Sequence, residues 1–187
     1  WINLTDDLRC IDSNRWLFTT EKNGQRSAMI LENGQSPFAL PGPVHINCLL
    51  EHTDSIVYAC GWNESPAENH LFAINLDATA CQQVSSQPGW HEFTLDPGNG
   101  AYIDRWTNEA TPLQIELKWL DQKNGPEHTL FSEQIDAQHP YHPFLNRHSN
   151  ASFGTVEAED GQTLHYRLTP PSKVTGKHPV IVYVYGG

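Results

Sequence analysis

Positive charge is scarce in this sequence. Its 187 residues include 11 Lys and Arg against 22 Asp and Glu, a formal net charge of −11 with the 10 His taken as neutral. A surface of this sign repels phosphate backbones and anionic lipid headgroups, so we expect no nucleic-acid partner and no anionic membrane partner. Long apolar runs are lacking as well. The longest, residues 180–185, is far too short to span a bilayer, which takes about 20 apolar residues.

Cysteine is also sparse. The four cysteines are Cys10, Cys48, Cys60 and Cys81. They form no C-x-x-C pair and no cluster with nearby His, so we expect no metal and no cofactor at these positions. Three of them lie in apolar stretches, where buried free thiols are the favoured interpretation and one disulfide is the alternative. Three Asn-x-Ser/Thr sequons, at Asn3, Asn63 and Asn150, matter only in a eukaryotic secretory route and leave the compartment open.

Helical periodicity is nearly absent, and short apolar or alternating runs take its place. Clear examples are residues 15–19, 55–59, 70–74 and 100–104, each bounded by Gly, Pro, Asn or Asp. Such runs predict strands, because β-branched and aromatic side chains suit a pleated sheet and the bounding residues suit turns. The dipeptide Asn23-Gly24 between two of the runs favours a two-residue hairpin, since both residues tolerate positive φ.

The predicted strands repeat along the chain. One apolar motif recurs at residues 16–18, 56–58 and 101–103, its partner strand at 27–31, 70–74 and 113–117, and a Pro-Gly turn at 41–45 and 88–91. A period of roughly 40 to 50 residues with about four strands per unit is typical of β-propeller blades, which bury their faces by stacking. A β-sandwich with accidental similarity is the alternative.

The length fits only part of a propeller. We expect residues 1–150 to form about three four-stranded blades, whereas a closed propeller has about four to eight. The remaining blades are therefore expected upstream of Trp1, in a longer protein from which this chain is a middle piece.

The pattern changes after His139. The Pro-rich stretch 138–143 predicts an exposed loop, and His139, His142 and His148 are interpreted as linker residues rather than metal ligands. A hairpin follows, with strands at 153–158 and 163–168 around an Asp-Gly turn. The apolar run 179–185 predicts a strand buried on both faces in a parallel sheet, the opening of a domain that continues beyond Gly187.

This order of parts resembles the dipeptidyl peptidase IV branch of the prolyl oligopeptidase family of serine peptidases. The resemblance is specific in a Glu-x-x-Asp-Gly-x-x-Leu-x-Tyr hairpin at 157–166, a Leu-x-Pro-Pro turn at 168–171 and Val-Tyr-Gly-Gly at 184–187. In the blades it is diffuse, with 20–24 similar to a Ser-Glu-Arg-Asp-Gly hairpin and 71–76 similar to a Leu-Tyr-x-Ile-x-Leu strand. It implies a mainly β fold: partial propeller blades at 1–150, then the first strands of an α/β-hydrolase domain at 151–187.

The resemblance also implies an activity and a site residue. Members of this family cleave peptides after proline, and the branch releases N-terminal Xaa-Pro dipeptides. Carried over to this sequence, Tyr185 donates its hydroxyl to the oxyanion of the tetrahedral intermediate, and Gly186 and Gly187 let the chain turn sharply beside the peptide. A packing tyrosine at the end of a strand is the alternative for Tyr185. The expected partner is a peptide substrate. The resemblance also implies a homodimer located outside the cytoplasm.

The sequence departs from the family pattern in what it omits. It contains no Gly-x-Ser-x-Gly motif, so the nucleophile, its Asp and His partners and the paired amine-binding glutamates are expected elsewhere in the parent protein. Glu51, His52 and Asp54 are interpreted as solvated residues of a turn between blades. We therefore expect this piece alone to be inactive. The alternatives are a non-catalytic propeller-type binding or scaffold module, and an acylaminoacyl or oligopeptidase relative.

Overall fold

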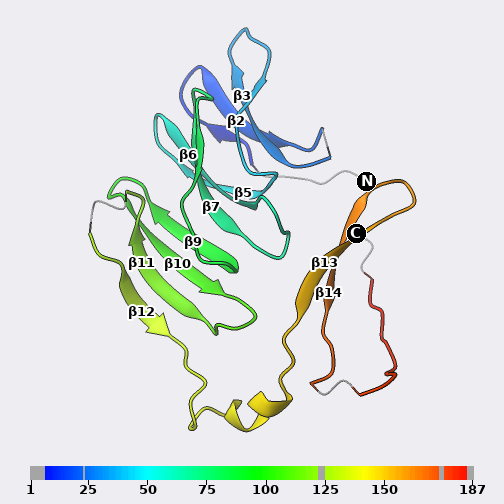
Figure 1. The fold of residues 1–187 in the computed structure, drawn as a ribbon. Helices are drawn as coiled ribbons and strands as arrows, with labels where there is room; N and C mark the ends of the chain where they lie inside the picture. Colours follow the sequence, from blue (N-terminus) through cyan, green and yellow to red (C-terminus); the bar gives the residue numbers. More distant parts are fainter. Residues whose placement is uncertain (1–6, 23, 122–124, 173–174, 185–187) are drawn as a thin grey trace. The chain divides into compact units, whose positions relative to one another are not determined.

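Antiparallel sheets dominate the computed structural model, which describes residues 7–22, 24–121, 125–172 and 175–184 (Figure 1). The chain divides into two compact units, Trp1–Glu133 and Gln134–Gly187, which are described separately below. The assignment of 1–150 and 151–187 to a propeller and to a hydrolase domain stays a prediction.

The first unit consists of three sheets of four strands within its described residues. The first sheet contains β1 (Arg9–Cys10), β2 (Arg15–Thr20), β3 (Ser27–Glu32) and β4 (Phe38–Ala39). The second contains β5 (His45–His52), β6 (Ile56–Trp62), β7 (His70–Asn75) and β8 (Cys81–Gln83). The third contains β9 (Trp90–Asp96), β10 (Ala101–Thr107), β11 (Gln114–Trp119) and β12 (His128–Ser132). In every sheet the spatial order of the strands equals their order in the chain.

This meander pattern confirms the predicted partial propeller. The repeated apolar motif lies in β2, β6 and β10, and its partner lies in β3, β7 and β11, which are the two central strands of each sheet. The two Pro-Gly turns lie where one sheet ends and the next begins, between β4 and β5 and between β8 and β9. The repeat in the sequence is therefore a repeat of whole sheets, which lie side by side in Figure 1.

The middle sheet is buried on both of its faces, as a blade between two others must be. Along β6 and β7, Val57, Ala59, Phe72 and Ile74 pack with the first sheet in one apolar cluster that also includes Leu17. The alternate positions form a second cluster with the third sheet. Its buried members are Tyr58, Leu71 and Tyr102. Alternation of side chains along a strand thus divides the middle sheet between its two neighbours.

The third sheet shows the opposite pattern, with one buried and one open face. Along β10, Tyr102, Asp104 and Trp106 are buried, while the residues between them are exposed. The edge strand β12 is exposed throughout its length. The charged residue Asp104 therefore faces the second sheet and not solvent.

Two turns differ from their predicted form. The Asn23-Gly24 hairpin is longer than two residues, because β2 ends at Thr20 and β3 begins at Ser27; Gly24 does adopt a positive φ of 82°. The residues Glu51, His52 and Asp54 do not lie between blades. They belong to the β5–β6 hairpin of a single sheet, where Glu51 and Asp54 are exposed and His52 is half-buried.

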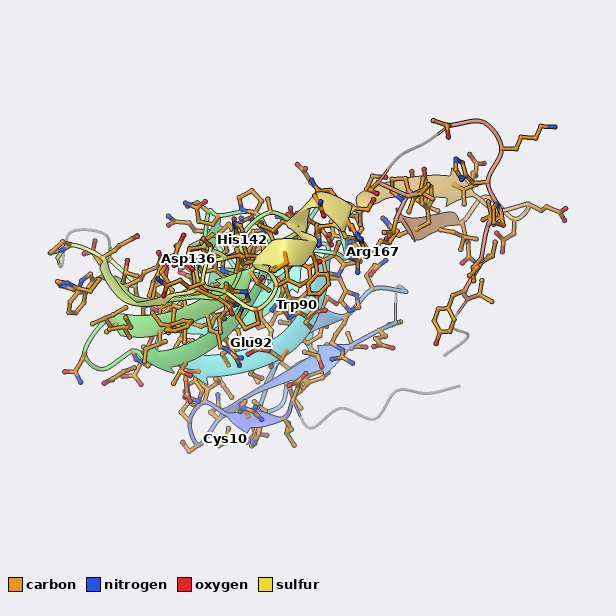
Figure 2. The ribbon with its side chains drawn as sticks, turned by 90° about the horizontal axis from the view of Figure 1, so that it is seen from below. Cys10, Trp90, Glu92, Asp136, His142 and Arg167 are labelled. Carbon is orange, nitrogen blue, oxygen red and sulfur yellow. A yellow bond between two sulfur atoms is a disulfide. The ribbon has the colours of Figure 1, made fainter. Side chains whose placement is uncertain are left out.

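The favoured interpretation of the cysteines is wrong for one pair. Cys48 and Cys60 form a disulfide between β5 and β6, at directly opposed positions with a Cα–Cα distance of 5.3 Å. The register shifts on both sides of Cys48 bring the two residues into this pairing. Cys10, labelled in Figure 2, is a free and exposed thiol, and Cys81 is free and partly buried.

The second unit contains the predicted hairpin. Its strands, β13 (Ser152–Glu157) and β14 (Thr163–Leu168), pair antiparallel around the Asp-Gly turn, with Gly161 at φ 81°. The Pro-rich linker before it is not entirely irregular, because His142–Arg147 form a 3-10 helix, η1. The hydroxyl of Tyr141 lies 2.7 Å from Nδ1 of His148, so this histidine makes a local contact in the linker.

The prediction of a buried strand near the C-terminus is wrong for the described residues. Residues 180–184 pair with no strand of the described chain, and their side chains are 77% to 95% exposed. A strand of this type is stable only between neighbouring strands, under covering helices. The described part of the chain supplies neither, so the sequence pattern alone does not produce the sheet.

Candidate functional site

The one catalytic residue predicted from the sequence, Tyr185, lies outside the described residues, together with Gly186 and Gly187. The ionisable side chains that the structure does bring together lie elsewhere, between the second and third sheets.

We call this group the polar seam. It consists of Glu68, Asn69, His70, Ser85, His91, Asp104, Glu116 and Lys118. His70 begins β7, Glu68 and Asn69 lie just before it, and Ser85 lies just after β8; the other seam residues belong to β9, β10 and β11. Antiparallel pairing places Phe93 and Glu116 on either side of Asp104, so inward-facing residues of three strands meet on one face.

Asp104 is the centre of the seam. Its carboxylate is 0% exposed and accepts hydrogen bonds from Nδ1 of His91 at 2.7 Å and from Nζ of Lys118 at 2.9 Å. A buried carboxylate without partners would be strongly destabilising, whereas here two charge-assisted bonds satisfy it. The three residues thereby tie β9, β10 and β11 together.

Lys118 is also held by a second carboxylate. Its Nζ lies 2.8 Å from Oε2 of Glu116, and the same oxygen accepts the indole N–H of Trp106 at 2.8 Å. Burial alone lowers the pKa of Lys118, but the hydrogen bonds to Glu116 and Asp104 outweigh burial and hold that pKa above its ordinary value. The lysine is therefore a permanent cation and cannot act as a base near neutral pH.

His91 has no nitrogen available for catalysis. Nδ1 faces Asp104, and Nε2 lies 2.8 Å from the main-chain carbonyl oxygen of Gln87, which can only accept a hydrogen bond. The ring is 0% exposed and makes stacked contacts with the rings of Phe93 and Trp106. A His-Asp pair of this geometry resembles a general-base dyad, but both ring nitrogens are committed to structural partners.

A second histidine, His70, contacts a serine and a glutamate, the residue types of a catalytic triad. Nδ1 of His70 lies 3.1 Å from Oγ of Ser85, and Nε2 lies 3.0 Å from Oε2 of Glu68. Ser85 is only 3% exposed, and its Oγ accepts the main-chain N–H of Leu71 at 3.0 Å. A nucleophile must reach its substrate. Ser85 is inaccessible and already bonded, so this arrangement is structural.

The Asn69 side chain links His91 of the third sheet to Asn47 of β5 in the second sheet. Its side-chain amide donates to the carbonyl oxygen of His91 at 2.6 Å, and its Oδ1 accepts from the amide of Asn47 at 2.8 Å. The rings of His70 and His91 lie 5.4 Å apart. The seam thus connects the second and third sheets through fully bonded polar groups, and no described buried side-chain nitrogen or oxygen lacks a partner. Such a network fixes one arrangement of the two blades.

Sequence reasoning missed the seam, although one signal was present. In the stretch 102–106 a charged residue occupies the inward position between Tyr102 and Trp106. A charge at an inward strand position requires a buried partner. Identifying His91 and Lys118 as those partners requires the register of three strands, which the sequence does not reveal.

The described residues offer neither a metal site nor a membrane-spanning helix. In residues 7–22, 24–121, 125–172 and 175–184, no group of three His, Cys, Asp or Glu side chains could hold a metal ion. Within the same ranges, no helix has the length and hydrophobicity needed to cross a bilayer.

Comparison with known proteins gives a consistent set of relatives. Residues 1–113 match the family described as the dipeptidyl peptidase IV (DPP IV) N-terminal region. The probable dipeptidyl-aminopeptidase B of Neosartorya fischeri is 25% identical over 138 residues, which cover 71% of this chain and 14% of that protein. The corresponding protein of Aspergillus niger is 26% identical over 141 residues, covering 71% and 15%. The chain thus spans about one seventh of these relatives.

Solved structures show the same fold. Dipeptidyl peptidase 4 of Porphyromonas gingivalis has a TM-score of 0.66 at 18% identity, over 85% of this chain and 22% of that one. The AtxE2 isopeptidase has a TM-score of 0.59 at 13% identity, over 92% and 26%. The family match covers more than half of the chain and the observed sheets agree with it, so this chain belongs to the dipeptidyl peptidase IV family, with residues 1–113 matching the N-terminal region of that family.

Proposed function

We propose that this chain is part of a serine-type dipeptidyl peptidase that releases Xaa-Pro dipeptides from the N-termini of peptides. In this proposal residues 1–150 are the last blades of a propeller that restricts access to the active site, and residues 151–187 open the hydrolase domain. The observation that supports it is the succession of three meander sheets and a separate hairpin in a chain whose curated relatives are dipeptidyl-aminopeptidases.

The polar seam has a supporting role in this function. A gate formed by stacked blades works only if neighbouring blades keep a fixed spacing. Apolar packing between the second and third sheets has three buried residues at its centre, Tyr58, Leu71 and Tyr102, with partly buried apolar side chains around them. The hydrogen bond from the Asn69 amide to the carbonyl oxygen of His91 crosses between the two sheets and is directional, and Asp104 holds the His91 side chain within the third sheet.

Tyr185 is the chain's contribution to catalysis in this proposal. When a serine attacks the peptide carbonyl, negative charge develops on the carbonyl oxygen, and a phenol aimed at that oxygen stabilises the intermediate more than the substrate. Loss of one such donor costs about 2.7–4 kcal/mol of transition-state stabilisation. The serine, the histidine and the amine-binding carboxylates lie in the remainder of the parent protein, so the isolated chain should hydrolyse no peptide.

The experiment compares two tyrosines in the full-length parent enzyme. Tyr185→Phe should lower kcat on an Xaa-Pro chromogenic substrate by at least tenfold, and by about 100-fold or more if the hydroxyl is a full oxyanion donor. Tyr183→Phe is the matched control, because the same atom is removed two residues earlier, and it should leave kcat nearly unchanged. Full turnover by Tyr185→Phe, or equal losses in the two variants, would refute the role of Tyr185.

The wild-type parent separates the alternatives. Turnover of N-acetylated aminoacyl substrates instead of Xaa-Pro substrates would identify an acylaminoacyl or oligopeptidase relative. Absence of turnover on all of them, in a correctly folded protein, would favour a binding or scaffold module. Sedimentation analysis of the same preparation tests the homodimer that the family resemblance implies.

A further inference from the structure

Asparagine followed by glycine is frequent in this chain, at residues 23–24, 33–34, 99–100 and 124–125. An Asn side chain can be attacked by the main-chain nitrogen of the next residue, and glycine, which has no Cβ, hinders that attack least. The structure describes both residues of two of these pairs, Asn33-Gly34 and Asn99-Gly100. Both asparagines are exposed, so exposure alone does not distinguish them.

The groups that would react at Asn33-Gly34 are free of hydrogen bonds to described residues. The pair lies in the turn between β3 and β4, where the main-chain N–H of Gln35 donates to the carbonyl oxygen of Glu32 at 3.0 Å. Gly34 has a φ of 76°, and a Cβ built on it would have no heavy atom within 4 Å. No described residue bonds to the side-chain amide of Asn33 or to the N–H of Gly34.

The same groups are held in place at Asn99-Gly100, between β9 and β10. The Asn99 side-chain amide donates to Oδ2 of Asp96 at 2.7 Å. The N–H of Gly100, which would be the nucleophile, donates to the carbonyl oxygen of Pro97 at 3.2 Å. Attack at this pair requires both the amide and the nucleophile to leave their partners.

We propose that Asn33 is a site of spontaneous deamidation in this protein and that Asp96 protects Asn99 from the same reaction. The main-chain nitrogen of Gly34 bonds to Cγ of Asn33, the Cγ–Nδ2 bond breaks, and ammonia leaves with the proton from the Gly34 N–H. Water then opens the resulting five-membered imide. Hydrolysis at one carbonyl gives Asp, and hydrolysis at the other gives isoaspartate, in which the main chain runs through the former side chain.

The modification changes the outer edge of the first sheet. Either product adds a negative charge beside Glu32, and isoaspartate also lengthens the main chain inside the β3–β4 turn. The strand that follows, β4, has only two residues and pairs with β3 at Met29 and Ile30. The product should therefore loosen β4 before it affects the second or third sheet.

The test follows both sites in one sample. The full-length parent protein is incubated at neutral or mildly alkaline pH and digested, and the Asn33 and Asn99 peptides are quantified by mass spectrometry, with isoaspartate detected by an isoaspartyl methyltransferase. We expect Asn33 to deamidate about tenfold faster than Asn99 or more, because the charged hydrogen bond of Asn99 must first be broken. Equal rates, or a faster reaction at Asn99, would overturn the proposal.

Two controls assign the difference to the fold. In urea, where both turns are lost, the two rates should converge, because both asparagines precede glycine; a tenfold gap that persists in urea would contradict the structural explanation. Asp96→Ala should accelerate deamidation of Asn99 in the folded protein and leave the rate at Asn33 unchanged. If Asn99 stays as slow in this variant, with an unchanged circular dichroism spectrum, Asp96 is not its protector and the proposal fails.

Discussion

The polar seam makes a quantitative prediction about stability, which Asp104→Asn tests. The carboxylate of Asp104 is 0% exposed and accepts hydrogen bonds from both His91 and Lys118. Asn has nearly the same shape but only one acceptor oxygen. Its NH2 group is a donor and would face the N–H of either His91 or Lys118, which is also a donor. Breaking a buried ion pair by removing one partner costs about 3–5 kcal/mol. Lys118 keeps its bond to Glu116, so we expect Asp104→Asn to lower the free energy of unfolding by about 3 kcal/mol, the lower end of this range.

Strands β9 and β10, which carry His91 and Asp104, also supply the control. Glu92, labelled in Figure 2, pairs with Arg105 at 3.0 Å across β9 and β10, and their side chains are 62% and 55% exposed. An exposed pair of this kind contributes about 0.2–1 kcal/mol, so Glu92→Gln should be almost neutral. The two substitutions remove one carboxylate charge each from the same sheet and differ mainly in burial.

The measurement is urea unfolding followed by tryptophan fluorescence. With a slope of about 2 kcal/mol per molar urea, a loss of about 3 kcal/mol lowers the midpoint of Asp104→Asn by about 1.5 M. Because the two residues share one network, Asp104→Asn combined with Lys118→Gln should cost less than the sum of the single changes. The reasoning is refuted if Asp104→Asn and Glu92→Gln shift the midpoint equally.

Two further predictions concern the disulfide and alkaline pH. Reduction of Cys48–Cys60, or replacement of both residues by Ala, should lower the free energy of unfolding by about 2–3 kcal/mol, whereas Cys10→Ala should not; an unchanged midpoint under reductant would show that the bond is absent. Burial raises the pKa of Tyr102 from 10.0 to about 12. The folded state then holds the phenol proton more tightly than the unfolded chain does. The contribution of Tyr102 to the free energy of unfolding is therefore complete below pH 10 and is lost as the pH rises to about 12. In Tyr102→Phe, the loss of stability between pH 10 and pH 12 should be smaller by about 2–3 kcal/mol than in the wild type. An identical loss in both proteins would contradict the raised pKa of Tyr102.

The repeat of whole sheets could be predicted from the sequence because it depends on local patterns. Residues 16–18, 56–58 and 101–103 recur at intervals of 40 and 45 residues with turn residues between them, and each lies in a central strand of its sheet. The hairpin around Gly161 was predictable for the same reason, since the Asp-Gly turn and its two flanking strands are contiguous. In both cases the information lies within a few residues of the element that it specifies.

The features that could not be predicted depend on residues distant in the sequence. The pairing of Cys48 with Cys60 follows from two register shifts in β5, and the partners of Asp104 follow from the alignment of three strands. The run 180–184 shows the converse, because an apolar pattern specifies a buried strand only where other strands and helices surround it. Tyr185 follows this run, so its role depends on the same absent surroundings.

In the proposed function, the parent protein of this chain removes dipeptides from free N-termini. The most direct test offers the full-length parent protein two peptides that share an Xaa-Pro N-terminus and differ only in acetylation of the terminal amine, with the released products identified by mass spectrometry. We predict release of the Xaa-Pro dipeptide from the free peptide and none from the acetylated one. Equal cleavage of both peptides, or cleavage of neither by the folded protein, would contradict the claim.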